Sequence, residues 1–131
     1  MAEAKGNPIR DRSFAFALSI VRLYQHLKNA REFVISKQLL RSGTSIGANI
    51  EEATAAASRR DFLYRMTIAS KEAREALYWL RLLDRSNLIH GLDVKSEIAA
   101  AEELVRMLTA IVRTTSRRMN LEETDPNPNF H

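Results

Sequence analysis

Seven arginines in two groups are the residues of this sequence best suited to chemistry, and the chemistry they suit is phosphate binding. A guanidinium group stays charged at neutral pH and offers several N–H donors to phosphate oxygens. In the second group, Arg106, Arg113 and Arg117 recur at spacings of seven and four residues, which places them on one face of a helix. We call the whole set the arginine patch, and it comprises Arg59, Arg60, Arg65, Arg106, Arg113, Arg117 and Arg118.

The arginine patch predicts contact with the backbone of RNA or DNA, without recognition of base sequence. The chain has no helix-turn-helix spacing, aromatic stacking motif or zinc-finger pattern, so its affinity for nucleic acid should fall steeply with salt. An ordinary solvated face, partly paired with Glu102 and Glu103, is the alternative interpretation of the same residues.

Four glutamates are candidate metal ligands, because inward-facing glutamates hold two metal ions in di-iron bundles. Those sites also use Glu-x-x-His pairs, which this chain lacks, and its three histidines follow no ligand spacing. Cationic neighbours are available at Arg41, Lys71 and Arg74, so we expect ion pairs and no metal or other cofactor. The carboxylates in question are Glu51, Glu52, Glu72 and Glu75.

Arg85 and His90 are the one pair with a catalytic spacing, since helical-bundle ribonucleases use an arginine and a histidine four to six residues apart. In such a site histidine acts as acid or base and arginine holds the phosphate. Here the pair crosses the expected helix end near Gly91. The chain has no cysteine nucleophile and no glycine-rich phosphate loop, so we predict no catalytic residues and no enzyme activity.

Composition indicates one all-α domain. The chain has 131 residues and is 45% hydrophobic, with four Gly and three Pro, too few for the turns of a strand-rich fold. The absence of Cys excludes a disulfide framework and thiolate metal sites. No run of about 18 apolar residues and no signal-peptide core occur, so a cytoplasmic protein without a membrane partner is expected.

Charge is distributed unevenly along the chain. The net charge is +4, but residues 120–131 hold Glu122, Glu123 and Asp125 and no Lys or Arg. Residues 1–119 therefore carry 20 basic and 13 acidic residues, a net charge of +7. A domain this basic should attract polyanions at moderate salt.

Apolar residues recurring every three or four positions predict four helices, over about 13–28, 35–57, 59–86 and 93–119. Their lengths and short connections predict an antiparallel up-down-up-down four-helix bundle over residues 13–119. A flexible segment over 1–12 should precede the bundle, and a disordered acidic tail over 120–131 should follow it.

Two local signals bear on these helices. Asp11 or Ser13 is expected to cap the first helix, and Ser58 the third. In the second, Gly43 and Gly47 are compatible with a turn, but the unbroken apolar spacing favours a continuous helix whose small residues let a partner approach closely.

The third helix carries more apolar side chains than one intramolecular seam would cover. This surplus predicts a homo-oligomer interface, while a thicker core is the alternative. The interface residues would be Leu63, Leu77, Tyr78, Trp79 and Leu82.

Four segments of the sequence together resemble a known family. They are the run from Gln38 to Ala53, the pair Asp61-Phe62, and the stretches 68–76 and 78–83. These segments closely resemble the bacterial four-helix-bundle proteins named after intervening sequences in 23S ribosomal RNA genes. The resemblance covers about residues 13–118. It implies a four-helix bundle, assembled as a ring-like homopentamer with basic surfaces, and brings no catalytic residues with it.

Proteins similar in fold, the accessory variability determinants of diversity-generating retroelements, bind nucleic acid and a reverse transcriptase. We therefore expect a non-enzymatic oligomeric scaffold or accessory factor that contacts the backbone of RNA or DNA, with a protein partner in addition or instead. The alternatives are a scaffold that binds only protein, and a helical-bundle ribonuclease using Arg85 and His90.

Overall fold

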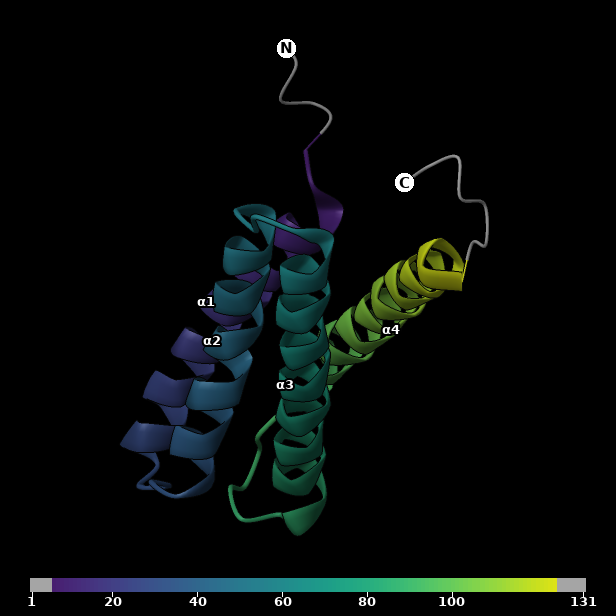
Figure 1. Ribbon diagram of the computed structural model, residues 1–131. Coiled ribbons are helices and arrows are strands. Elements are labelled where there is room, and N and C mark those ends of the chain that lie inside the picture. The colour runs from purple at the N-terminus through teal and green to yellow at the C-terminus, as the bar shows by residue number, and fades with distance from the viewer. Residues whose placement is uncertain (1–5, 125–131) are drawn as a thin grey trace.

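The computed structural model describes residues 6–124, and four α-helices account for most of them. The helices are α1 (Pro8–Asn29), α2 (Ile35–Thr54), α3 (Arg59–Ser86) and α4 (Lys95–Thr124), and no strand occurs within this described part (Figure 1). The predicted all-α four-helix fold is confirmed. None of these helices combines the length and the apolar character needed to cross a membrane.

Successive helices run antiparallel and pack side by side. Each helix contacts the next one in the chain, and α4 closes back on α1, whereas α1 does not contact α3 and α2 does not contact α4. An ion pair joins Arg10 near the start of α1 to Glu51 near the end of α2, and another joins Arg59 at the start of α3 to Glu122 near the end of α4. Figure 1 shows α4 inclined to the other three helices, so that its C-terminal half points away from α1 and α2.

Helix α1 begins earlier than the predicted start at Ser13. Asn7 is its N-cap, with the side-chain oxygen accepting from the Arg10 N–H at 3.3 Å, and Pro8 occupies the first turn. Ile9 is buried in the core, which fixes this turn against the bundle. The prediction of a flexible segment over 1–12 is therefore wrong for residues 8–12, and residues 1–5 lie outside the described part.

Helix α2 is continuous through both glycines, as predicted. An added Cβ at Gly43 would lie 3.0 Å from Cγ1 and Cγ2 of Ile20, so the absence of a side chain lets α1 pack directly against α2 here. The helix ends at Thr54, three residues before the predicted end at Ala57.

Capping residues determine the ends of α3 and the start of α4. The Ser58 side chain accepts from the Asp61 N–H at 3.0 Å, which confirms the predicted cap. Asn87 ends α3 in the left-handed conformation, at φ 55°. The Asp93 side chain accepts from the Lys95 N–H as α4 begins. That helix continues past the predicted end at Met119 to Thr124, so the predicted disordered tail is wrong for residues 120–124, and residues 125–131 lie outside the described part.

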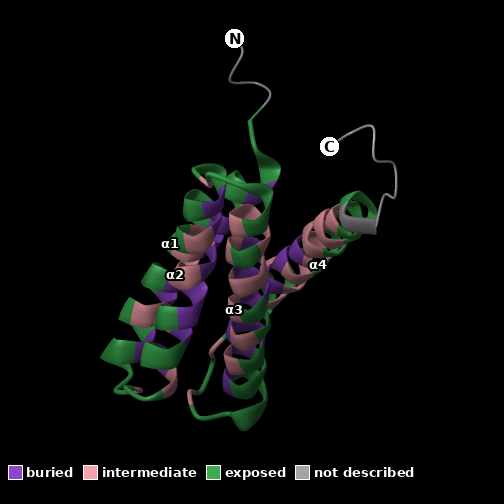
Figure 2. Cartoon of the chain, viewed as in Figure 1, coloured by how far each residue is buried: buried purple, intermediate pink, exposed green. Residues whose placement is uncertain are grey.

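The core is continuous along α1, α2 and α3 but not along α4 (Figure 2). The last buried residue of α4 is Leu108, and no residue from 109 to 122 is buried. The largest fully buried side chains from the four helices include Ile20, Leu27, Leu39, Ile46, Ile50, Met66, Leu80, Leu83, Leu104 and Leu108.

Candidate functional site on α3 and α4

The two groups of the arginine patch meet where the start of α3 faces the later part of α4. Arg59 and Arg118 line one surface hollow together with Phe62 and Thr115, which we call the terminal hollow. Arg59 also forms an ion pair with Glu122. The antiparallel arrangement therefore brings the two groups together, as the sequence predicts.

A second hollow lies farther along the same pair of helices, and we call it the α3–α4 hollow. Arg113 and Arg117 line it from α4, and Arg74 lines it from α3. Arg74 Nη2 donates a hydrogen bond to Thr109 Oγ1 at 2.8 Å, which ties the two helices across this hollow. The remaining lining residues are Ser70, Thr109, Val112 and Ser116.

The later arginines of the patch are not neutralised by the carboxylates that the sequence offered as partners. Glu102 pairs with Arg81 at 3.4 Å, and Glu103 pairs with Arg12. Within residues 6–122, no ion pair involves the remaining patch members of α4, which are Arg106, Arg113, Arg117 and Arg118. The positive charge of this part of α4 thus stands without a fixed counter-charge among the described side chains.

Three members of the arginine patch lie outside both hollows. The Arg65 guanidinium is 5.6 Å from the centre of the Tyr64 ring, in a cation–π arrangement. Arg60 is exposed in the first turn of α3, and Arg106 is exposed on α4. The patch is therefore an extended surface with two concave parts.

The predicted carboxylate set makes ion pairs at three of its four positions. Arg41 Nη1 lies 2.9 Å from Glu72 Oε2, and the other terminal nitrogen of Arg41 contacts Glu75. Burial lowers the pKa of Arg41, but the hydrogen bonds to Glu75 and Glu72 and the charges of these two carboxylates together outweigh this and leave the pKa raised. Arg10 Nε donates to Glu51 Oε1 at 2.6 Å, and this hydrogen bond raises the pKa of Arg10. No group of three or more His, Asp or Glu in the described part is arranged to hold a metal ion.

Arg85 and His90 do not form a site. Arg85 lies in the last turn of α3, and His90 lies in the connection to α4. Both residues are exposed, and in the described part no hydrogen bond or ion pair joins them.

The predicted interface residues of α3 divide between core and surface. Leu77 is only 8% exposed and belongs to the core, so its side chain packs within one chain. Leu63 and Trp79 are half-buried, and the Trp79 indole N–H donates to Glu75 Oε2 at 3.2 Å. Tyr78 is 57% exposed and Leu82 is also exposed, so these two are available to another molecule.

An apolar stripe on α1 was not predicted as a surface. Phe14, Leu18 and Val21 follow each other at spacings of four and three residues, and each is exposed, Phe14 at 64%. Their spacing is also that of a core-facing stripe, because a broad apolar stripe is typical of a bundle helix, so the spacing alone does not indicate a surface.

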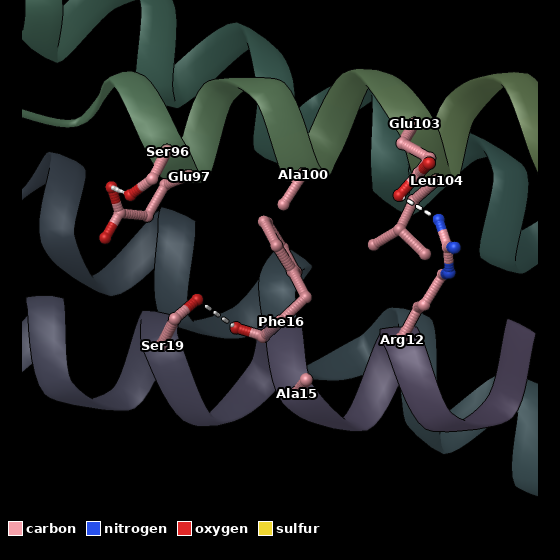
Figure 3. A pocket seen from close by; sticks show the side chains of 9 residues that line it. All are labelled: Arg12, Ala15, Phe16, Ser19, Ser96, Glu97, Ala100, Glu103 and Leu104. Atoms are coloured by element: carbon pink, nitrogen blue, oxygen red, sulfur yellow. Dashed lines mark hydrogen bonds and ion pairs between the residues drawn. The ribbon is translucent and has the colours of Figure 1, made fainter. Parts of the chain in front are cut away.

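A hollow between α1 and α4 has an apolar floor made by Phe16 and Leu104 (Figure 3). Small side chains such as Ala15 and Ala100 leave it unfilled, and the ion pair between Arg12 and Glu103 lies beside it. Arg12, the one cationic residue that lines this hollow, is thus paired with a carboxylate, whereas no ion pair involves Arg113 or Arg117 within residues 6–122.

At the candidate phosphate-binding surface, the residues that the sequence did not indicate lie on the α3–α4 hollow. The sequence indicates Arg74 only as a partner for carboxylates, and it gives no separate signal for Ser70, Thr109 and Ser116. Thr109, Arg113 and Arg117 recur at intervals of four, as do Ser70 and Arg74, so each set lies on one helical face. That spacing was visible in the sequence, but the register between α3 and α4 was not.

Comparison with known proteins gives a family and a solved structure. The family model described as 23S rRNA-intervening sequence protein matches residues 5–110. A crystal structure of a protein with unknown function from the S23 ribosomal protein family, from Bacteroides thetaiotaomicron VPI-5482, is 48% identical and superposes with a TM-score of 0.75. The match covers 79% of this chain and 97% of that chain. No curated protein matches the sequence.

Proposed function

The chain belongs to the 23S rRNA-intervening sequence protein family, and from this premise we propose that it is a non-enzymatic, self-associating scaffold that contacts the backbone of nucleic acid through the arginine patch. The observation that carries this proposal is the positive charge on the later part of α4, at Arg113, Arg117 and Arg118, which has no ion-pair partner among the side chains of residues 6–122.

The position of these arginines makes them accessible to an extended polyanion. No residue of α4 between 109 and 122 is buried, and Figure 1 shows the C-terminal half of α4 pointing away from α1 and α2. Arg106 and Arg117 are separated by eleven positions, about 16 Å along a helix that rises 1.5 Å per residue. A row of cations of this length spans several phosphates of one strand.

Self-association would multiply this surface. The exposed apolar side chains Tyr78 and Leu82 on α3 and the stripe Phe14, Leu18 and Val21 on α1 are candidates for subunit contacts. The family resemblance implies a homopentamer, in which the arginine patch would occur five times. Repeated sites on one rigid particle bind a long polymer much more tightly than a single site does.

The test is fluorescence anisotropy of a labelled single-stranded RNA or DNA at two salt concentrations, with mass determined by light scattering. We expect an oligomer that binds at low salt, and an observed affinity that falls as salt rises. The double substitution Arg113→Gln and Arg117→Gln should weaken binding at least tenfold and reduce the salt dependence.

A matched control removes the same charge elsewhere. Arg22→Gln with Lys37→Gln changes two exposed cations on α1 and α2, and should leave the affinity within about twofold of wild type. An oligomer that binds no nucleic acid even at low salt would refute the proposal and favour a scaffold for protein partners alone. Equal losses in both double variants would show that net charge, and not the patch, is responsible.

A further inference from the structure

Ser70 differs from the other buried serines of the described part. Ser13, Ser36 and Ser42 each donate a hydrogen bond to a backbone carbonyl oxygen three or four residues earlier, at 3.0, 2.7 and 3.0 Å. Ser70 is 8% exposed, and within residues 6–122 its hydroxyl has no hydrogen-bond partner. The backbone thus satisfies the other three buried serines, whereas the Ser70 hydroxyl is left to bond a ligand or a water molecule.

The Ser70 hydroxyl is reached from the α3–α4 hollow. No completely buried side-chain nitrogen or oxygen of the described part lacks a partner, so the unpaired Ser70 oxygen must have some contact with solvent. Ser70 lines the α3–α4 hollow, which has a volume of about 360 Å³. Among the described residues, the one buried serine whose hydroxyl has no partner therefore lines one of the two concave parts of the arginine patch.

Three arginines line the same hollow. Arg74 stands one turn after Ser70 on α3, and Arg113 and Arg117 face them from α4. No carboxylate lines this hollow. Three like charges beside one cavity repel each other, and an anion placed among them removes that repulsion.

The donors are also partly fixed before any ligand arrives. Thr109 Oγ1 accepts from Arg74 Nη2, which holds that guanidinium against α4 and leaves the threonine hydroxyl hydrogen free to donate. Arg74 lines the hollow from α3, and Arg113 and Arg117 line it from α4, so both helices can supply N–H donors. Several donors converging from two sides suit a tetrahedral anion with oxygens in several directions.

We propose that the α3–α4 hollow is a site for a single phosphate group, held by the guanidinium groups of Arg74, Arg113 and Arg117 and by the hydroxyl groups of Ser70 and Thr109. The site is argued from its own residues. Only the assignment of the phosphate to a nucleic-acid backbone, as opposed to a free phosphate or phosphomonoester, rests on the proposed function.

The experiment titrates the full chain with inorganic phosphate, and separately with acetate at the same ionic strength, while amide chemical shifts are followed by NMR. Saturable shifts centred on Ser70, Arg74, Thr109 and Arg113, seen with phosphate only, are the expected result. Equal and unsaturable shifts with phosphate and acetate would overturn the site, because they indicate general screening.

Variants separate this site from the rest of the arginine patch. Arg74→Gln should weaken phosphate binding at least tenfold and Ser70→Ala severalfold. Arg118→Gln, in the terminal hollow, removes one cation from α4 outside the α3–α4 hollow and should change phosphate affinity less than twofold. If Arg74→Gln destabilises the chain, Ser70→Ala still tests the site. The Ser70 hydroxyl has no hydrogen-bond partner in the described part of the chain, so its removal breaks no internal hydrogen bond there.

The same variants distinguish failure of this site from failure of the proposed function. RNA binding that Arg74→Gln and Ser70→Ala both weaken assigns the phosphate to a nucleic-acid backbone. Saturable phosphate binding by a wild-type protein that binds no RNA or DNA supports the site for free phosphate compounds and refutes the proposed function. RNA binding that neither variant affects, without saturable phosphate binding, overturns the site and leaves the proposed function standing.

Discussion

Replacing each of the two glycines of α2 by alanine should change stability in opposite directions. In a helix interior alanine is more favourable than glycine by about 0.8–1 kcal/mol, so both substitutions gain this amount from propensity. They differ in what the new methyl group meets. At Gly47 the nearest atom is the Ser13 carbonyl oxygen at 3.5 Å, an ordinary contact, whereas at Gly43 it is Ile20, with Cγ1 and Cγ2 both at 3.0 Å.

Ile20 has little freedom to move away. Its side chain is completely buried, and a β-branched residue in a helix has essentially one χ1 rotamer, so neither methyl-bearing branch can rotate out of contact. Overpacking of this kind costs about 1–3 kcal/mol. The net expectation is that Gly47→Ala stabilises the protein by about 0.5–1 kcal/mol and that Gly43→Ala destabilises it by as much as about 2 kcal/mol.

Urea unfolding followed by circular dichroism, at one protomer concentration, measures both effects. The denaturation midpoint should rise for Gly47→Ala and fall for Gly43→Ala, with unchanged slopes. A double-mutant cycle with Ile20→Ala adds a control: the penalty at Gly43 should shrink when the side chain that it meets is removed. Equal stabilisation by both alanines would refute the close contact between α1 and α2 on which this reasoning depends.

Three further outcomes follow from single contacts. Ser58→Ala removes the N-cap of α3 and should lower the free energy of unfolding by about 1 kcal/mol, measured by urea denaturation, whereas no change would mean that the cap contributes nothing. Glu122→Gln removes the ion-pair partner of Arg59 and should raise RNA affinity severalfold at low salt in the anisotropy assay; a fall in affinity would contradict the assignment of Arg59 to the binding surface. Leu82→Ser should reduce the mass measured by light scattering with little loss of stability, whereas Leu77→Ala should cost about 2–5 kcal/mol of stability, because Leu77 is in the core. An oligomer unchanged by Leu82→Ser would place the subunit contacts elsewhere.

The fold could be predicted where local signals and apolar period agree. Helix α3 combines a serine cap with an unbroken apolar repeat, and its bounds follow from both. The start of α1 was missed because Asn7 and Pro8 are followed by the charged residues of its first turn, where Ile9 is the single buried apolar residue. An N-cap signal that is not followed by an apolar repeat does not indicate whether the first turn of the helix packs against the core.

Burial could not be predicted from period alone, because it depends on how the partner helices are inclined. Phe14 and Leu18 have the spacing of core residues, yet both are exposed. Leu77 was assigned to an outer surface, yet it is buried. In each case the apolar character of the residue is clear from the sequence, but whether its side chain faces the core or the solvent is not. That depends on where the neighbouring helices lie, which the sequence of one helix does not specify.

The inclination of α4 accounts for the candidate site as a whole. Its contacts with α1 include the Arg12–Glu103 ion pair, near the end of its first third, and its last buried residue is Leu108. Beyond that point Figure 1 shows α4 pointing away from α1 and α2, and the groove between α3 and α4 is lined mainly by polar side chains. A helix that continues after its core has ended gains little from apolar burial there, which leaves those positions free to carry charge. The arginines of α4 occupy these positions, and the hollow that contains Ser70 is the part of the groove where the second helix supplies donors as well.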